Sequence, residues 1–178
     1  MVSDSFFRIG KRLYQEHLVA GSFGNMSIRT HDEAFLITRT GSYLDEPGDP
    51  VRVPIFGDVP KEASSEWRVH RAVYQQTRHH AIVHAHPPYA IAASLLFDEI
   101  TPLDSEGKMF CPTIPIASGE PGTSELAEDV AECLALVPLC IARGHGTFTA
   151  GKTLEEACLY TSLAEHSCRV LSVMNSFR

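Results

Sequence analysis

The chain has 178 residues, of which 44% are hydrophobic and 21% charged, proportions typical of a soluble globular protein. Its formal net charge of −7 disfavours nonspecific binding to nucleic acid or to an anionic membrane, because both would repel it. No apolar run approaches the roughly 20 residues that span a bilayer, and the N-terminus lacks the layout of a secretory signal. We therefore expect a single domain over residues 1–178 that works in the cytoplasm.

The first half of the chain predicts a mixed order of helices and strands. Apolar spacing predicts a helix over residues 3–20 and short strands near 25–29 and 34–38, with glycines between them. The stretch 51–60 alternates apolar residues with others and contains prolines, which favours an edge strand followed by a loop. A helix is expected over 64–76, with one of its two leading serines as the N-cap.

The middle of the chain predicts a strand over 81–86 that a pair of prolines ends. Pro88 suits the first turn of a helix, which we expect to run through Phe97. His79 and His80 stand at the end of the preceding helix, where a cation interacts favourably with the helix dipole. We expect both side chains at the surface. The stretch "CPTIPIAS" then predicts an extended segment interrupted by prolines.

The last third of the chain continues this alternation. "TSELAEDVAECLAL" predicts an amphipathic helix, and "PLCIARGHGTFTAG" predicts two short strands around a histidine. Thr153 and Glu156 have capping-box spacing, so a final helix is expected from there to about Asn175. The sum is an α/β sandwich with helices packed on a mostly antiparallel sheet.

Cysteine usage agrees with a reducing compartment. The five cysteines are odd in number, are scattered and include no C-x-x-C pair. We expect buried free thiols at all five positions, which are Cys111, Cys133, Cys140, Cys158 and Cys168.

Two of the nine histidines stand one residue apart in "IVHAHPPYA". Residues i and i+2 of a strand point to the same face about 6.5–7 Å apart, so His84 and His86 can converge on one ion. Catalytic zinc commonly has three protein ligands and an open position, so a third ligand is expected elsewhere. The best candidate is His145, because the glycines on both sides of it permit a close approach of the backbone.

An anion site is suggested near the start of the helix at 64–76. Ser64 and Ser65 offer hydroxyls, and the helix start offers free backbone N–H groups, which together suit a phosphate. Glu66 follows them, either as a carboxylate that complements the helix dipole or as a functional group. The segments "GSFGNMS" and "TRTGS" are also rich in small donor-bearing residues, although each alone is typical of a turn.

Five motifs in order, "GNMS", "TRTG", "SSEW", "HAHP" and "GHG", together resemble the class II aldolase/adducin family, and its L-fuculose-1-phosphate aldolase group in particular. The likeness spans nearly the whole chain. It implies a three-layer sandwich in which a nine-stranded, mainly antiparallel sheet lies between helices. It also implies a zinc-dependent cytoplasmic enzyme that acts on a sugar phosphate as a homotetramer with active sites at subunit interfaces.

The resemblance also implies a role for each matched residue. The metal, Zn²⁺ or alternatively Mn²⁺ or Co²⁺, would be held by the three histidines, and Glu66 would be both the catalytic carboxylate and a ligand in the absence of substrate. The expected reaction is reversible retro-aldol cleavage of a ketose 1-phosphate to dihydroxyacetone phosphate and an aldehyde. The substrate phosphate would be held by Gly24, Asn25, Thr40, Gly41, Ser64 and Ser65.

The sequence departs from the fuculose aldolase pattern on the aldehyde side. That group has one tyrosine in a loop and another on a C-terminal tail, and both help complete the aldehyde side of the site. Here the loop stretch "TPLDSEGKMFCP" contains no tyrosine, and Arg178 follows the last helix directly. The general acid is therefore unassigned, with Glu106, Tyr89 and His17 as candidates. Arg39 stands where the family often has proline, and it either adds a positive charge beside the phosphate or points to solvent.

Other functions on the same scaffold remain open. Ribulose-phosphate 4-epimerases usually have aspartate at the position of Glu66, whereas methylthioribulose-1-phosphate dehydratases keep glutamate, so dehydration is the main alternative to aldol cleavage. An adducin-like interaction module is disfavoured because the three histidines and Glu66 are all present. A purely structural zinc is disfavoured because such sites usually have four protein ligands, and no cysteine lies near the motifs.

Overall fold

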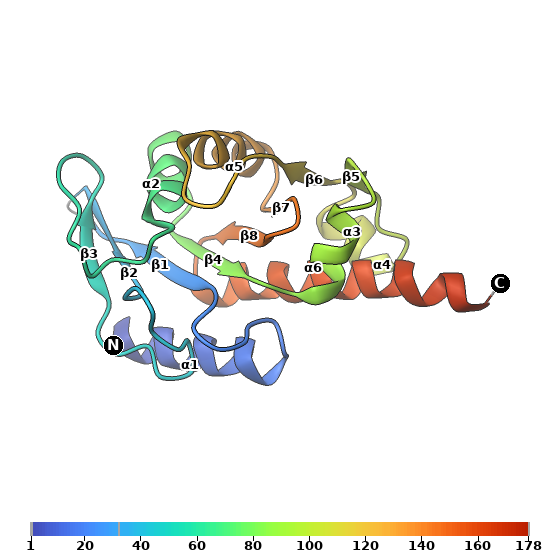
Figure 1. Cartoon of the computed structure of the whole chain (residues 1–178), viewed down its shortest axis with the longest axis horizontal. Coiled ribbons are helices and arrows are strands. Elements are labelled where there is room, and N and C mark those ends of the chain that lie inside the picture. The colour runs from blue at the N-terminus through green and yellow to red at the C-terminus, as the bar shows by residue number, and fades with distance from the viewer. Residues whose placement is uncertain (1, 32, 178) are drawn as a thin grey trace.

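A sheet of eight strands forms the middle layer of the computed structural model, which describes residues 2–31 and 33–177 (Figure 1). The strands lie in the order β3-β2-β1-β4-β8-β7-β6-β5, and every neighbouring pair is antiparallel except β6 and β7. Their bounds are β1 Asn25–Arg29, β2 Ala34–Ile37, β3 Val51–Pro54, β4 Ala81–Ala85, β5 Glu99–Ile100, β6 Ile114–Ala117, β7 Leu139–Ala142 and β8 Gly146–Gly151.

Helices cover both faces of this sheet, so the expected three-layer α/β sandwich is confirmed (Figure 1). One face carries α2 and α5, and the other carries α1 and α6 together with the short α3 and α4. Their bounds are α1 Val2–Gln15, α2 Trp67–Gln76, α3 Pro88–Ser94, α4 Ser105–Phe110, α5 Ser124–Leu136 and α6 Leu154–Met174. No helix in residues 2–31 and 33–177 combines the length and apolar character of a membrane span.

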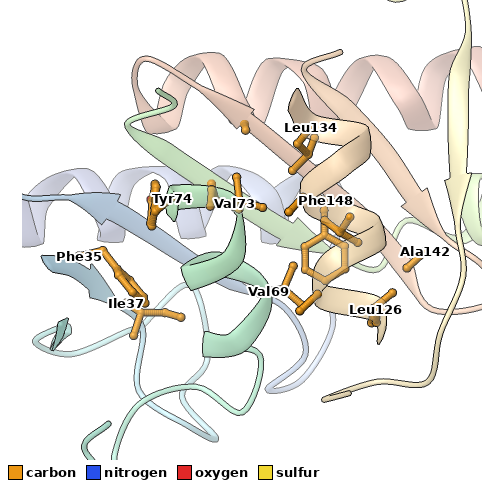
Figure 2. Close-up of a cluster of buried hydrophobic side chains, with 14 of the residues drawn as sticks. Phe35, Ile37, Val69, Val73, Tyr74, Leu126, Leu134, Ala142 and Phe148 are labelled. Atoms are coloured by element: carbon orange, nitrogen blue, oxygen red, sulfur yellow. The ribbon is translucent and has the colours of Figure 1, made fainter. Parts of the chain in front are cut away.

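The core beneath α2 and α5 determines how α2 lies on the sheet. Figure 2 shows Val69 and Val73 of α2 and Leu126 of α5 directed toward Phe148 of β8. All four side chains are fully buried. Because α2 begins directly after Glu66, this packing also fixes the position of the Glu66 carboxylate.

The expected ninth strand is not formed within the described residues. Arg39 and Ala63 form only an isolated antiparallel bridge, although Thr40 N donates to Glu62 O at 2.9 Å and Ser64 N to Thr38 O at 3.1 Å. Pairing stops there because the chain turns at Gly41, whose φ is +72°. The short pairing nevertheless places the "TRTG" segment beside the two serines that precede α2.

The first helix is shorter than predicted, because it ends at Gln15 rather than near residue 20. His17 adopts φ +58°, Leu18 N donates to Leu13 O at 2.9 Å, and His17 N donates to Tyr14 O at 3.1 Å. These two bonds close a Schellman motif, which ends a helix. The same turn also holds the backbone just after β4, because Leu18 O accepts a hydrogen bond from His86 N at 2.9 Å.

The start of α2 also differs from the prediction. The N-cap is Glu66, with no side-chain cap bond, rather than one of the serines. The reason is an extra turn before the helix, in which Trp67 N donates to Ser64 O at 3.1 Å. The two serines therefore lie in the turn before α2 and not at its cap.

Several other element ends differ from those predicted. The helix α3 ends at Ser94 instead of Phe97, and the short helix α4 was not expected at all. Because α2 ends at Gln76, His79 and His80 lie beyond it. His80 is exposed as expected, whereas His79 is half-buried with its Nε2 at 2.9 Å from Leu134 O.

The C-terminal elements agree closely with the sequence. Thr153 Oγ1 accepts a hydrogen bond from Glu156 N at 3.3 Å, and the Glu156 carboxylate accepts one from Lys152 N at 2.5 Å, so the cap is closed one residue earlier than in a standard capping box. All five cysteines are free thiols, of which four are buried and Cys133 is half-buried.

Candidate functional site

The three candidate ligand histidines come together at one end of β4. His84 lies near the end of this strand, His86 follows it directly, and His145 lies in the turn between β7 and β8. One ring nitrogen from each residue lies within 4.8 Å of those of the other two, and the Nε2 atoms of His84 and His86 are 3.0 Å apart. The convergence expected from the H-x-H motif and the "GHG" motif is thus present.

The pairing of β4 with β8 produces this convergence. His84 lies opposite Phe148 and Ala85 opposite Thr147, so the turn that carries His145 is brought beside the end of β4. A Cβ atom at Gly146 would lie 2.2 Å from Ala85 O. Only glycine therefore permits the approach that places His145 against the other two rings.

Hydrogen bonding fixes the tautomer of His84. Its Nδ1 lies 2.9 Å from the carbonyl oxygen of Thr147, which only accepts, so Nδ1 carries the proton and donates. Nε2 is left with a free lone pair and faces His86. The ring also stacks on Phe148, with centroids 4.1 Å apart, so the hydrogen bond and the stacking together fix its orientation.

All three imidazoles are neutral near physiological pH. Burial lowers the pKa of His84 well below its ordinary value, and the neighbouring His86 and His145 lower it further. Burial is the main cause that lowers the pKa of His86 to about 4, and repulsion between the protonated forms of His86 and His145 is the second. Burial also lowers the pKa of His145. A metal binds neutral imidazole, so this environment keeps the ring lone pairs available.

Unsatisfied atoms indicate that these residues fit a cation. Among the described residues, His145 Nδ1 and Glu66 Oε2 are buried without a hydrogen-bond partner. A buried polar atom left in this way costs about 1–3 kcal/mol, and a cation that takes up lone pairs removes part of that cost. Three imidazole nitrogens form a donor set that suits zinc and related divalent metals.

One cavity of about 200 Å³ joins the histidines to the predicted anion-binding segments. Every site residue expected from the sequence lines it, together with Arg39, Ser22 and Phe23. Arg39 thus contributes to the cavity wall although its side chain is exposed. The expected residues in the wall are Gly24, Asn25, Thr40, Gly41, Ser64, Ser65, Glu66, His84, His86 and His145.

Among the described residues, Glu66 is the only carboxylate in the cavity wall. It is 7% exposed, and burial raises the pKa of its carboxyl, while Arg68 and the backbone N–H of Gly122 act in the opposite direction. Its oxygens lie outside the group of mutually close ligand atoms that the three histidines form. The carboxyl therefore combines a raised pKa with a place in the same cavity as the histidines.

Some candidates are not brought to the site, and one residue there was missed. Glu106, Tyr89 and His17 do not line the cavity. His70 had no predicted role, yet it is fully buried and bonded to Asn25 in the cavity wall. Its position four residues after Glu66 on the same helix, and hence on the same face, was the signal available in the sequence.

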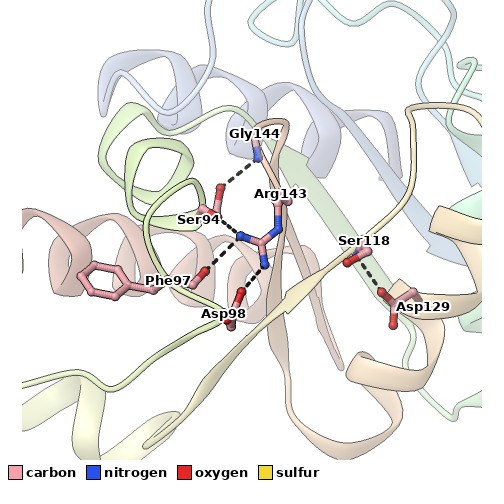
Figure 3. A network of polar contacts seen from close by, with 7 residues as sticks. All are labelled: Ser94, Phe97, Asp98, Ser118, Asp129, Arg143 and Gly144. Atoms are coloured by element: carbon pink, nitrogen blue, oxygen red, sulfur yellow. Dashed lines mark hydrogen bonds and ion pairs between the residues drawn. The ribbon is translucent and has the colours of Figure 1, made fainter.

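Arg143 joins the turn that carries His145 to the end of α3 (Figure 3). Arg143 Nη1 donates to Ser94 O at 2.8 Å and to Phe97 O at 3.3 Å, and its Nη2 lies 2.9 Å from Asp98 Oδ1. Gly144 N also donates to Ser94 Oγ at 2.9 Å. The turn before His145 is thereby tied to the end of α3, the helix that begins two residues after His86.

Comparison with known proteins identifies the family of this chain. Residues 4–172 match the family model described as the class II aldolase and adducin N-terminal domain. The chain belongs to this family. It is an enzyme of the aldolase type, and the resemblance expected from the five motifs is confirmed.

Relatives within the class II aldolase family carry more than one activity. An L-fuculose phosphate aldolase of Methanococcus vannielii is 35% identical over 178 residues, which cover 97% of this chain and 96% of that protein. The crystal structure of L-fuculose-1-phosphate aldolase from Thermus thermophilus superposes with a TM-score of 0.94 at 35% identity, covering 98% of this chain and 94% of that one. A 3-oxo-tetronate 4-phosphate decarboxylase of Escherichia coli K12 is 29% identical, covering 94% of this chain and 84% of that protein.

Loss of either His84 or His145 is expected to remove tight metal binding. His84→Ala and His145→Ala each delete one imidazole of the three, and Zn²⁺ titration of the metal-free variants should show no tight equimolar site. His80→Ala, an exposed histidine, is the matched control and should bind one equivalent like the wild type. Equimolar tight binding by both site variants would contradict the metal centre.

Arg143→Gln is expected to weaken metal binding without removing a ligand. The substitution removes the donors that tie the His145 turn to α3, so we expect the Kd for Zn²⁺ to rise about tenfold with an unchanged stoichiometry. Competition with a chromogenic chelator measures this, with Arg78→Gln at an exposed position as control. An unchanged Kd would mean that the contacts of Arg143 have no influence on the metal site.

Glu66→Gln is expected to stabilise the metal-free protein at neutral and alkaline pH. Because burial raises the pKa of this carboxyl, the folded state disfavours its charged form above the folded-state pKa, and the penalty disappears below the unfolded-state pKa. The variant should melt a few degrees above the wild type near pH 8 and match it near about pH 4. Glu62→Gln, at an exposed neighbouring position, should change the Tm at neither pH. A lower Tm for Glu66→Gln near about pH 8 would contradict the raised pKa of the Glu66 carboxyl.

Proposed function

We propose that this chain is a zinc-dependent aldolase that cleaves a ketose 1-phosphate reversibly into dihydroxyacetone phosphate and an aldehyde. The observation that carries the proposal is the single cavity in which three neutral imidazoles and one buried carboxyl face a wall rich in hydrogen-bond donors. Such a cavity can hold a cation and an anionic group side by side. A sugar phosphate that chelates a metal through its oxygens has this pair of requirements.

The donor-rich wall supplies the site for the phosphate. Ser64, Ser65 and Thr40 contribute hydroxyls, and Asn25 contributes an amide. The glycines at 24 and 41 shape the two loops, and a Cβ at Gly24 would lie 2.7 Å from His84 O. Arg39 adds a positive charge to this wall, which favours an anion.

The metal side is assigned to His84, His86 and His145, with Glu66 as an additional ligand when no substrate is present. When bound, a divalent cation there supplies Lewis-acid stabilisation of the negative charge that develops on the substrate oxygens beside the broken bond. Zinc is the favoured metal because imidazole suits it, and Mn²⁺ or Co²⁺ are alternatives.

Glu66 moves the proton at C3 of the substrate. When the C3–C4 bond breaks, its electron pair stays with C3, and the protonated carboxyl of Glu66 delivers a proton to that carbon. In the direction of synthesis the carboxylate removes the same proton. A buried carboxyl with a raised pKa is suited to both roles, since it exchanges its proton closer to neutral pH than an exposed glutamate does.

The proton on the C4 oxygen requires a group that this cavity lacks among the described residues. Apart from Glu66 and the histidines, Arg39 is the only ionisable side chain in the described part of the cavity wall. We propose that a neighbouring copy in a homotetramer supplies the missing group at the subunit interface, with Tyr89, Glu106 and His17 as candidates. Exposed apolar side chains beside the His145 turn support an interface there, because Leu95 and Leu96 are 62% and 78% exposed.

The wider setting follows from the same features. We propose that residues 1–178 act as one class II aldolase domain in the cytoplasm, with a small-molecule substrate and with neither nucleic acid nor membrane as a partner. The formal charge of −7 supports the exclusion of both polyanionic partners. The family match over residues 4–172 supports the single domain.

A second candidate activity is loss of CO₂ from a 3-oxo acid phosphate. The E. coli decarboxylase relative supports it, and decarboxylation, like aldol cleavage, leaves an electron pair on the carbon beside a carbonyl. Dehydration or 4-epimerisation, expected from the sequence as alternatives, uses the same groups but releases no dihydroxyacetone phosphate on its own.

A product assay tests the proposed activity. The zinc-loaded protein should release dihydroxyacetone phosphate from at least one member of a panel of ketose 1-phosphates, and Glu66→Gln should lower kcat by about 10²–10⁴-fold. Glu62→Gln is the matched control and should retain wild-type activity.

Failure of this assay has a defined meaning. If the wild type releases no dihydroxyacetone phosphate across the panel while zinc remains bound, the aldolase assignment is wrong. The same samples should then be tested for CO₂ release from a 3-oxo acid phosphate and for water loss from methylthioribulose 1-phosphate.

A further inference from the structure

Four buried polar side chains form a continuous line from the last turn of α2 to the cavity wall. Tyr74 OH lies 2.7 Å from Ser27 Oγ, Ser27 Oγ lies 2.6 Å from His70 Nδ1, and His70 Nε2 lies 2.6 Å from Asn25 Oδ1. All four residues are 4% exposed or less. Of the four, only Asn25 lines the cavity.

The direction of the hydrogen bonds follows from Tyr74 at the buried end. Within the described residues, the only hydrogen-bond partner of its hydroxyl is Ser27 Oγ. Burial raises the pKa of the Tyr74 phenol far above its ordinary value, so the group keeps its proton. A buried O–H group needs an acceptor, and Tyr74 therefore donates to Ser27.

The remaining protons are then determined in turn. Ser27 accepts from Tyr74 and uses its own single proton to donate to His70 Nδ1. Burial lowers the pKa of His70 to about 3, so the ring is neutral and has one N–H group. Because Nδ1 accepts, the proton is on Nε2, which donates to Asn25 Oδ1.

We propose that this order of protons holds the Asn25 amide with its oxygen toward His70 and its NH₂ group toward the cavity, so that His70, Ser27 and Tyr74 are positioning residues for the anionic group of the substrate. The role toward the anion rests on the proposed phosphate site. A reversed amide would direct its oxygen at the anion and repel it. The reversed order would also leave the Tyr74 hydroxyl without an acceptor among the described residues.

The tautomer of His70 tests the proton order without reference to any reaction. We expect long-range ¹H–¹⁵N spectra of zinc-loaded, histidine-labelled protein near neutral pH to show the His70 proton on Nε2. His84 should show the opposite tautomer, with its proton on Nδ1, and it serves as an internal contrast. His70→Gln assigns the signals. A His70 proton on Nδ1 would overturn the proposal, and this measurement uses the wild-type fold.

Binding of inorganic phosphate tests the consequence. Titration calorimetry of the zinc-loaded protein should show a Kd about tenfold higher for His70→Leu, which removes the N–H donor. His70→Gln places an amide nitrogen near the position of Nε2 and should bind within about threefold of the wild type. His80→Leu, at an exposed position, should have no effect. Wild-type affinity in His70→Leu would refute the positioning role.

The two measurements separate this proposal from the proposed function. If His70 has its proton on Nε2 but the wild type binds no phosphate, the amide orientation stands and the phosphate site is wrong. If phosphate binds and Asn25→Ala weakens it, yet the His70 proton is on Nδ1, the phosphate site stands and the positioning network is wrong. Should His70→Leu fail to fold, the tautomer measurement decides the proposal alone.

Discussion

The antiparallel pairing of β4 with β8 is the constraint on which the site depends. In this register the end of β4 meets the start of β8, and the turn that carries His145 comes to rest against His84 and His86. A shift of the register by one residue would turn His84 to the opposite face of the sheet, because side chains alternate along a strand. The convergence of the three histidines is therefore a product of strand pairing, and Gly146 is needed because the backbones approach too closely for any side chain.

The helix α2 connects the core to the chemistry. Its apolar side packs Val69 and Val73 against the sheet, whereas Glu66 and His70, one turn apart, face the cavity and its wall. Both polar groups are buried, which raises the pKa of the carboxyl and lowers that of the imidazole. Burial favours the uncharged form in each case, so one helix supplies a carboxyl with a raised pKa and a histidine that stays neutral.

The sequence predicted the convergence of the three histidines more reliably than the ends of the elements. The convergence of His84, His86 and His145 was predictable because a strand period and two flanking glycines are local signals. The end of α1 was not, because it depends on His17 adopting a left-handed conformation that is uncommon for residues other than glycine. The buried polar groups were harder to foresee for a related reason. His70 reads as one more polar residue on an amphipathic helix, and only the tertiary arrangement shows that β1 brings Ser27 and Asn25 to its two ring nitrogens. Long-range polar pairing is not encoded by periodicity, and so sequence patterns identify ligands before they identify the residues that hold them.

An acidic protein that takes an anionic substrate must create a local field opposite to its net charge. The cavity wall contains one arginine and one carboxyl whose burial favours its neutral form, while its three histidines are neutral. The protein thus contributes little negative charge where the anion is proposed to bind, although its formal net charge is −7. A divalent cation held by the histidines would be the largest charge in a cavity of about 200 Å³, and it would favour both the charged form of Glu66 and the binding of a phosphate. Under the proposed function, metal and substrate binding would be coupled, because each ion would reduce the electrostatic cost of placing the other in a small, partly buried space.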